Sequence, residues 1–256
     1  MSKMLEKIRK LNWVLQEVSK GTLTFGEMCE ILSELTNSNV YIVDAEGLVL
    51  GVAYENADDS SAITDPDTGV DIFSKEYTES LNRISESKIN VRGEELLKIL
   101  NEEFSTQNKY HMIIPIVGGQ RWGTVLMARY EPEFSEEDLV LAEVGATGVG
   151  IEIKRRVIQA QEEEARKENV VKMAISTLSY SEAEAVQKIF EELREMEGIL
   201  VASKIADKSR ITRSVIVNAL RKLESAGVIE SKSLGMKGTH IKVLNNKFYD
   251  QLAKMK

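Results

Sequence analysis

The chain has 256 residues, 43% of them hydrophobic and 29% charged, a composition ordinary for a water-soluble globular protein long enough for two domains. One cysteine excludes an internal disulfide, and one cysteine with two histidines is too few for a structural zinc site, so we expect no bound metal. No run of about 18 apolar residues could span a membrane, and the amphipathic N-terminus does not resemble a signal peptide. We therefore expect a cytoplasmic protein.

The charge is spread unevenly along the chain, whose net charge is −8. Residues 199–256 contain 12 Lys and Arg against four Asp and Glu, a net +8, so the rest of the chain carries −16. A basic segment suits a polyanion, whereas an acidic body repels one. This asymmetry indicates two parts with different partners.

The first half of the chain predicts an α+β domain in which helices flank two hairpins. Apolar residues at helical spacing predict helices over 4–18 and 25–36. Two β-rich runs around turn residues predict hairpins over 39–54 and 112–130. The segment 55–110 between them is polar and carries turn formers, so we expect it to be irregular, with a loop at Pro66, Asp67 and Gly69.

Beyond the second hairpin the sequence predicts one long helix. Ser135 with Asp138 resembles a capping box, and no breaker follows for more than 25 residues, which is typical of a spine or a dimer-forming segment. The glycines of GATGVG (145–150) lie inside this helix and have the wrong spacing for a dinucleotide loop, so we expect them to let two helices approach. Ser181 with Glu184 predicts the cap of the next helix. The domains expected are therefore 1–155, a linker helix over 156–178, and 179–256.

The last 58 residues follow the order of a winged helix-turn-helix, with the two helices over about 202–221. A short helix over 199–208 and a turn precede a second helix that Thr212 can cap and Gly227 can end. The runs VIESKS and THIKVL predict two strands that form the wing. One face of the second helix is apolar: Val215, Ile216, Ala219, Leu220 and Leu223.

The opposite face of the second helix carries side chains that suit DNA. A recognition helix enters the major groove with its positive N-terminal end first, where arginine bonds guanine, asparagine bonds adenine and hydroxyls contact phosphate. With the first helix and the wing included, the residues expected at DNA are Ala202, Ser203, Lys204, Thr212, Arg213, Ser214, Asn218, Arg221, Lys222 and Lys237. Ser214 is also a candidate phosphorylation site, because a phosphate there suits the helix dipole and repels DNA.

Two other interpretations of this face stay open. A charged helix face is often only solvated, and winged domains also serve as protein-docking modules. The order of turn, helix and wing, together with the local charge of +8, favours DNA.

The same residues carry a resemblance to a known family. VASKIADKSRITRSVIVNALRKLESAGVIESKSLGMKGTHIKVLNNKF resembles the C-terminal domain of the CodY family, the GTP-sensing pleiotropic repressors of low-GC Gram-positive bacteria. SNVYIVDAEG, IIPIVGG, GTVLMARY, DLVLAEVGATGVGIEI and AISTLSYSEAEA resemble the rest of the family segment by segment. The resemblance implies a GAF-type ligand-sensing domain, a long linker helix and a winged helix-turn-helix.

The resemblance implies that the GAF-type domain binds a branched-chain amino acid, with isoleucine the first candidate. The family's aromatic pocket residues correspond to Phe73 and Tyr77. The family's carboxylate-binding arginine has no counterpart, because no arginine lies between Lys10 and Asn82. Arg83 is our candidate substitute; the alternatives are Arg92, Lys75 and backbone N–H groups of residues 55–75.

The resemblance also implies a nucleotide site, where this sequence departs from the family. Members that bind GTP carry a basic Ser-Arg-Arg-Gly-Lys turn, and this chain has Asp44-Ala45-Glu46-Gly47-Leu48. Asp44 lies in that turn and Glu152 matches a family residue on the linker helix, but the family's lysine there is Val157. Because an acidic turn repels a triphosphate, we expect weak or absent GTP binding.

The function implied is that of a homodimeric transcriptional regulator, mainly a repressor, that binds AT-rich palindromic operators and controls nutrient-starvation and stationary-phase genes. Two other classes stay open: a metabolite-sensing scaffold whose winged domain binds protein, and an enzyme. GAF folds that host disulfide-cycling redox chemistry need two or three thiols, and one cysteine cannot supply them. We therefore expect no enzymatic activity.

Overall fold

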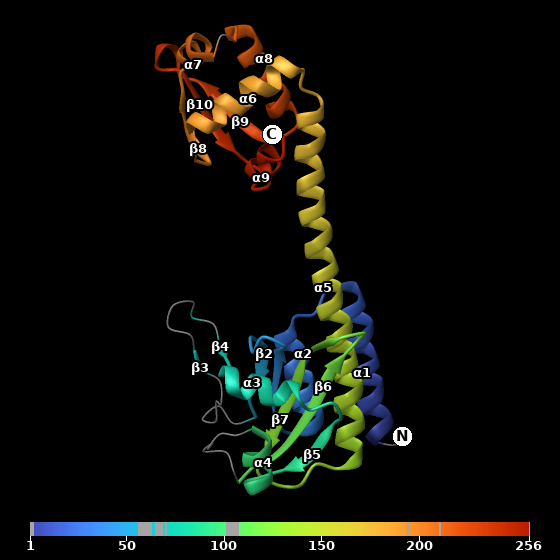
Figure 1. The fold of residues 1–256 in the computed structure, drawn as a ribbon. Helices are drawn as coiled ribbons and strands as arrows, with labels where there is room; N and C mark the ends of the chain where they lie inside the picture. Colours follow the sequence, from blue (N-terminus) through green and yellow to red (C-terminus); the bar gives the residue numbers. More distant parts are fainter. Residues whose placement is uncertain are drawn as a thin grey trace. The chain divides into compact units, whose positions relative to one another are not determined.

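The computed structural model describes residues 3–55, 63–64, 69, 71–100, 108–193, 195–209 and 211–255. The chain divides into two compact units, residues 1–157 and 158–256, each with its own hydrophobic core. One 41-residue helix, α5 (Glu136–Ser176), begins in the first unit and ends in the second (Figure 1). The segment 156–178, expected as a linker, therefore forms the later part of this helix and the two residues after it.

The first unit is built on an antiparallel sheet in the order β2-β1-β7-β6-β5. Its strands are β1 (Asn39–Asp44), β2 (Val49–Ala53), β5 (Lys88–Val91), β6 (Tyr110–Val117) and β7 (Arg121–Arg129). The pairs β1–β2 and β6–β7 confirm the two predicted hairpins. A separate short pair joins β3 (Ile63–Thr64) to β4 (Asp71–Ile72).

Helices cover both faces of this sheet (Figure 1). The helices α1 (Lys3–Lys20), α2 (Phe25–Thr36) and the first part of α5 pack on one face, and α3 (Lys75–Asn82) and α4 (Gly93–Leu100) pack on the other. The alternation of strand residues divides the side chains between two cores. In β1, Val40 and Ile42 face α1, α2 and α5, whereas Tyr41 and Val43 face α3 and α4.

The prediction that residues 55–110 are irregular was wrong for much of the segment. It contains β4, α3, β5 and α4. Ser74 caps α3 by accepting a hydrogen bond from the Tyr77 backbone N–H, 3.2 Å away, and Tyr77 and Leu81 lie on the buried face of the helix. These elements are short, so their periodic signal in the sequence is weak. Of the expected loop residues, Gly69 is described with positive φ, and Pro66 and Asp67 lie outside the described residues.

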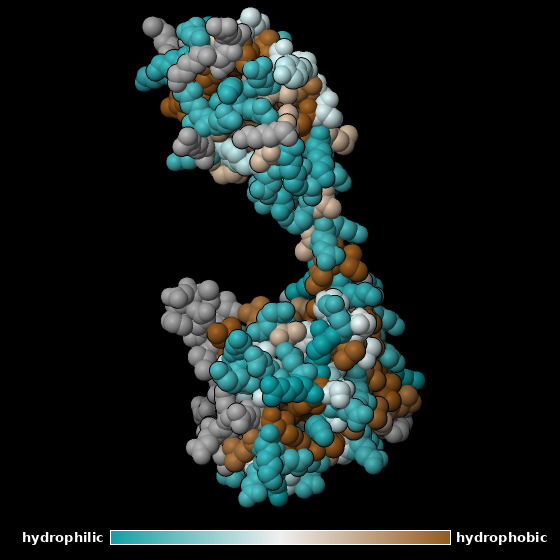
Figure 2. All heavy atoms as spheres, viewed as in Figure 1, coloured by the Kyte–Doolittle hydropathy of each residue, from teal (hydrophilic) through white to brown (hydrophobic). Residues whose placement is uncertain are grey.

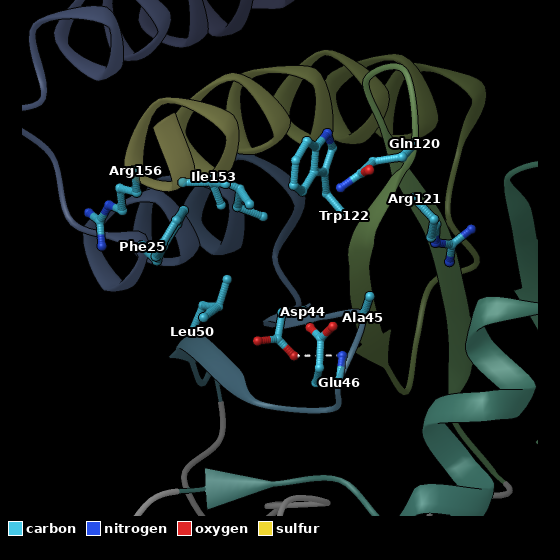
Figure 3. Close-up of a pocket in the computed structure, with 11 residues that line it drawn as sticks. Phe25, Asp44, Ala45, Glu46, Leu50, Gln120, Arg121, Trp122, Ile153 and Arg156 are labelled. Atoms are coloured by element: carbon cyan, nitrogen blue, oxygen red, sulfur yellow. Dashed lines mark hydrogen bonds between the residues drawn. The ribbon is translucent and has the colours of Figure 1, made fainter. Parts of the chain in front are cut away.

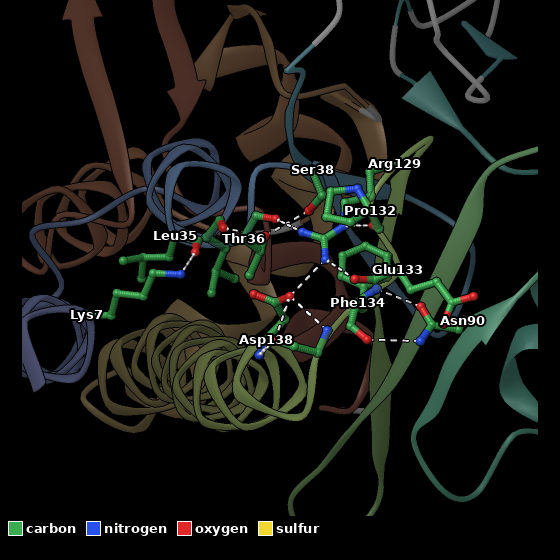
Figure 4. A network of polar contacts seen from close by, with 12 residues as sticks. Lys7, Leu35, Thr36, Ser38, Asn90, Arg129, Pro132, Glu133, Phe134 and Asp138 are labelled. Carbon is green, nitrogen blue, oxygen red and sulfur yellow. Dashed lines mark hydrogen bonds and ion pairs between the residues drawn. The ribbon is translucent and has the colours of Figure 1, made fainter. Parts of the chain in front are cut away.

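A network around Arg129 holds the start of α5 against the sheet and α2 (Figure 4). Arg129 is the last residue of β7. Its guanidinium donates hydrogen bonds to the carboxylate of Asp138 at 2.9 Å and to the carbonyls of Thr36, Pro132 and Glu133. Asp138 also accepts from the backbone and side chain of Ser135, which confirms the predicted capping box. Both members of the ion pair are buried and make further hydrogen bonds, the condition under which a buried pair is tolerated.

The glycines of α5 lie where other helices approach it. A Cβ on Gly145 would meet Leu32 of α2 at 2.6 Å, and one on Gly148 would meet Leu15 of α1 at 2.3 Å. This confirms that GATGVG is a helix-packing segment. Cys29 on α2 is fully buried, and burial raises the pKa of its thiol, so its place is in the core.

The second unit is a small α+β domain with a sheet in the order β8-β10-β9. Its helices are α6 (Tyr180–Leu193), α7 (Ala202–Ser209), α8 (Arg213–Ser225) and α9 (Phe248–Ala253). Its strands are β8 (Glu197–Leu200), β9 (Ile229–Ser233) and β10 (Thr239–Val243), with a 3-10 turn at Gly235–Lys237 between the last two. The predicted second helix and wing strands are confirmed.

Two local predictions in this unit were wrong. The segment expected to be helical from 199 begins as strand β8, because Glu197–Leu200 pairs with β10, and α7 starts only at Ala202. The cap of α6 is formed by Ser179 and Glu182 rather than Ser181 and Glu184. Both motifs have the same residue types at the same spacing, and only the structure shows which one begins the helix.

Candidate nucleic-acid interface and ligand sites

The helix α8 separates its side chains into a buried face and an exposed face. Ile216, Ala219, Leu220 and Leu223 are buried in the core of the second unit, and Val215 is half-buried. The exposed residues of the helix and its cap include Thr212, Arg213, Ser214, Asn218, Arg221 and Lys222. This is the face on which the sequence predicted contacts with DNA. The helix ends at Ser225, and Gly227 follows it with a φ of 70°, the left-handed value typical of the chain just beyond a helix.

The N-terminus of α8 carries two exposed hydroxyls. Thr212 occupies the cap position with an extended backbone, but its side chain makes no capping hydrogen bond and lies 3.0 Å from the Ser214 hydroxyl. The prediction that Thr212 occupies the cap position is therefore confirmed, but its side chain does not form the capping hydrogen bond. Exposed N–H groups and hydroxyls at the positive end of a helix dipole form a suitable site for a phosphate oxygen.

The other residues expected at DNA lie on α7 and in the turn between β9 and β10. Lys204 is exposed on α7, and Lys237 is exposed in the turn between β9 and β10. Ala202 is half-buried and packs against the core, so its side chain contributes to the fold. The backbone of Ser203 lies in α7, and its side chain is outside the part of the chain that the structure describes.

Lys222 differs from its neighbours on the exposed face. Its amino group donates to the Glu182 carboxylate at 2.7 Å and to the Thr177 carbonyl at 2.9 Å. The sequence placed Lys222 at DNA because it is a cation on the right face of the helix. In the structure its charge faces the segment that joins α5 to α6, and its contact with DNA stays a prediction.

An aromatic cluster lies on the α3 side of the first unit. The ring centroids of Phe73 and Tyr77 are 4.8 Å apart, and Phe73 lies 5.7 Å from Tyr41, which is itself 5.7 Å from Tyr54. The side chains of Phe73, Tyr77 and Tyr41 are each at least 95% buried. The structure thus brings together the two aromatic residues expected to contact an effector, and adds two tyrosines that the sequence analysis missed.

The cations expected to hold an effector carboxylate lie apart from this cluster. Arg83 follows α3 with a largely exposed side chain 4.0 Å from Glu79, and Lys75 approaches the same carboxylate at 3.9 Å. Arg92 lies over the ring of Tyr110. Arg121, which the sequence analysis missed, reaches α3 by donating to the carbonyls of Leu81 and Ile84. Much of the 55–75 segment expected to offer backbone donors lies outside the described residues.

A cavity of about 330 Å³ lies where the β1–β2 turn faces α5 (Figure 3). The residues that line it are Phe25, Asp44, Ala45, Glu46, Leu50, Gln120, Arg121, Trp122, Ile153, Arg156 and Val157. Its wall is mostly apolar, and the turn contributes two carboxylates. Of the two residues expected at a nucleotide, Asp44 lines this cavity and Glu152 does not.

The carboxylates of Asp44 and Glu152 have internal roles. Asp44 accepts from the backbone N–H groups of Glu46 at 2.9 Å and Leu48 at 2.8 Å, and so closes the hairpin turn. Glu152 is fully buried and accepts from Arg155 and Arg156. Burial alone raises the pKa of Glu152, but the hydrogen bonds from the two arginines outweigh burial and leave the pKa below its ordinary value.

The two units together define a class of protein: a ligand-binding sheet domain joined by a helix to a winged helix-turn-helix with a basic, hydroxyl-bearing recognition helix. That class is the ligand-responsive DNA-binding regulator. Residues 3–177 match the family model described as the CodY GAF-like domain, and residues 196–256 match the CodY helix-turn-helix domain. The chain belongs to the CodY family.

Curated relatives match over the whole chain. The global transcriptional regulator CodY of Caldanaerobacter subterraneus subsp. tengcongensis is 51% identical over 260 residues, covering 99% of this chain and 98% of that one. The CodY protein of Clostridium perfringens strain SM101 is 48% identical over 258 residues, with both chains fully covered. The solved cofactor-binding GAF domain of the nutrient sensor CodY from Clostridium difficile is 42% identical, with a TM-score of 0.49, and covers 60% of this chain and 99% of that one.

These relatives are transcriptional regulators, and the present chain is a DNA-binding transcriptional regulator with a GAF ligand-binding domain rather than an enzyme. The described part of the chain contains no helix with the length and hydropathy needed to cross a bilayer.

Replacing Arg213 by Ala should weaken specific DNA binding by about 1–3 kcal/mol, the usual worth of one base-reading arginine. The side chain is exposed in the first turn of α8, so the fold should be unaffected. The measurement is a titration of a DNA duplex selected from a random-sequence pool by the unaltered chain. Lys188→Ala on α6 is the matched control, because it removes a half-exposed cation from another helix of the same unit. Unchanged affinity for Arg213→Ala would exclude it from the interface.

Proposed function

We propose that this protein is a homodimeric regulator, mainly a repressor, that binds AT-rich palindromic operators in the cytoplasm and responds to a branched-chain amino acid. The regulated genes would be those of nutrient starvation and stationary phase. The observation that carries the effector part is the buried aromatic cluster around Phe73 and Tyr77, on the face of the sheet opposite α1, α2 and α5. Apolar rings suit an aliphatic side chain such as that of isoleucine.

A free amino acid carries a carboxylate and an ammonium group, and each needs a partner in the binding site. Burying a carboxylate or an ammonium group without a partner costs several kcal/mol. Arg83 and Lys75 are largely exposed and share Glu79, and Arg92 lies over Tyr110. We therefore propose that isoleucine or a close relative binds more weakly than in family members that carry a dedicated arginine.

For a nucleotide we propose weak or absent binding. The cavity beside the β1–β2 turn offers Arg121 and Arg156, but Arg121 is already bonded to the carbonyls of Leu81 and Ile84, and Arg156 to Glu152. Asp44 and Glu46 add negative charge at the same wall. The balance disfavours a triphosphate.

Calorimetric titration of the full chain tests the effector. We expect heat from isoleucine, leucine or valine, and little or none from GTP. Glu46→Arg reverses one charge of the turn and should raise affinity for GTP without changing that for isoleucine. Tight GTP binding by the unaltered chain, or no response to any of the three amino acids, would contradict the proposal.

The homodimer is supported by an apolar stripe on α5. Val140, Val144, Ile151 and Ile158 are 36–52% exposed. With the polar residues Thr147 and Lys154 between them, these positions are spaced alternately by four and three residues, which is the spacing of a coiled coil. The β-branched side chains at 144, 151 and 158 would then lie along one seam between two helices. A two-fold axis along α5 also suits a palindromic operator.

Ile151→Glu should shift the chain toward monomers, because a charge would then face its own copy in the pair. Molar mass by light scattering at several protein concentrations measures this. Gln161→Glu, at an exposed polar position on the same helix, should leave the mass unchanged. A dimer that persists in Ile151→Glu would place the interface elsewhere.

Phosphorylation of Ser214 is proposed as a switch of DNA binding, since its exposed hydroxyl lies in the first turn of α8 beside Thr212. Ser214→Asp should fold normally and lose affinity for DNA, because a negative charge there meets DNA phosphates. Ser225→Asp adds the same charge to the last turn of the same helix and should bind more nearly like the unaltered chain. Full binding by Ser214→Asp in a gel shift would rule out this switch.

The same gel shift, repeated at rising salt, separates DNA binding from the alternative of a protein-binding scaffold. Loss of the shift as salt rises is expected of a protein that neutralises DNA phosphates. No shift at low salt would favour the scaffold.

A further inference from the structure

One cation on the exposed face of α8 is engaged within the second unit. The amino group of Lys222 lies 2.7 Å from the Glu182 carboxylate and 2.9 Å from the Thr177 carbonyl. The side chain of Lys222 is 41% exposed, and that of Glu182 is 9% exposed. This contact joins residues 40 and 45 positions apart in the chain.

Its partners form one junction between two helices. Thr177 directly follows the last residue of α5, and Glu182 lies in the first turn of α6. The same Glu182 oxygen accepts from the Ser179 backbone N–H at 2.7 Å, so it caps α6 and binds Lys222 together. The hydrogen bond from Lys222 is the largest cause that holds the pKa of Glu182 below its ordinary value, so the carboxylate is ionised at neutral pH.

The geometry points to Lys222 as a positioning residue: it ties the recognition helix α8 to the α5–α6 junction and acts on DNA only through the placement of that helix. Base contacts tolerate displacements of about 0.5 Å at most, so the orientation of α8 matters as much as the side chains on it. The tie reaches the end of the same helix that begins in the ligand-binding unit. This inference rests on DNA binding by α8 and adds how α8 is held.

The salt dependence of DNA binding distinguishes a positioning lysine from a phosphate-binding one. Log affinity falls as log salt rises, and each lysine that neutralises one phosphate adds about 0.9 to the steepness of this fall. Removing such a lysine makes the fall less steep by that amount. Lys222→Met should weaken binding to the selected duplex at least fivefold and leave the slope unchanged. Arg221→Ala, which removes the adjacent exposed cation from the DNA-facing surface, should lower the slope.

Glu182→Gln removes a negative charge, whereas Lys222→Met removes a positive one, and we expect both variants to weaken DNA binding. Removing a negative charge from this unit should tighten DNA binding if only the overall field mattered. If Glu182 holds Lys222, the variant should weaken binding, and the double variant with Lys222→Met should bind no more weakly than either single variant. Lys222→Arg, which can still reach both acceptors, should recover most of the affinity.

A double-mutant cycle in urea unfolding tests the tie without DNA. Lys222→Met and Glu182→Gln should destabilise the chain by amounts that do not add. Additive effects on unfolding would show that the two side chains act separately and would overturn the inference. So would a slope lowered by about one in Lys222→Met together with tighter binding in Glu182→Gln. Failure of the unaltered chain to bind any duplex would count against the proposed function and leave the cycle as the test of the tie.

Discussion

A single helix contributes residues to both hydrophobic cores of this protein, and the two units are joined through it. The helix α5 runs for 41 residues, and its first part places Leu141, Ala142 and Val149 in the core of the first unit. Its last turns place Val171 and Ala174 in the core of the second. Between these two stretches the helix is mostly polar (Figure 2) and carries its own short-range pairs, such as Glu163 with Arg166 and Glu164 with Lys167. The backbone of α5 is the covalent connection between the ligand-binding unit and the DNA-binding unit.

A polar contact secures each end of α5. At the start, Arg129 bonds Asp138 and three backbone carbonyls, among them that of Thr36 at the end of α2. At the other end, the Thr177 carbonyl and the Glu182 carboxylate accept hydrogen bonds from the amino group of Lys222. Losing one member of such a group leaves the other charge or carbonyl without its partner, which is costly where the site is buried. These contacts connect elements that are far apart in sequence.

The cations of the chain therefore fall into two groups that composition alone does not distinguish. Arg129, Arg155 and Lys222 are engaged with acceptors inside their own unit. Arg213 and Lys237 are exposed on the DNA-binding unit. The net charge of +8 in the last 58 residues suits DNA, and the proposed contacts of Arg213 and Lys237 with DNA belong to the second group. A similar distinction applies to the acidic turn of the first unit, where Asp44 closes the hairpin through two backbone N–H groups and Glu46 is left exposed beside the cavity.

The sequence by itself determined the class of the fold, the long helix and the face of α8 that carries Arg213, Ser214 and Asn218. These features depend on hydrophobic periodicity and caps, which are local and leave a strong pattern. The hairpins were equally clear, because β-rich runs around a turn have few other solutions. Short elements were not: α3 and α4 contain eight residues each, and the pairing that makes Glu197–Leu200 a strand involves β10, some 40 residues later.

Only the tertiary structure decided which chemically equivalent side chains are used where. Ser179 with Glu182 and Ser181 with Glu184 are the same motif, and packing of α6 selects the first. Lys222 and Arg221 are neighbouring cations, and the nearness of Glu182 and Thr177 engages the amino group of Lys222. Tyr41 joins Phe73 because alternation along β1 places it on the α3 side of the sheet. Such choices depend on distances between residues remote in the chain, and a pattern of neighbours in sequence does not contain them.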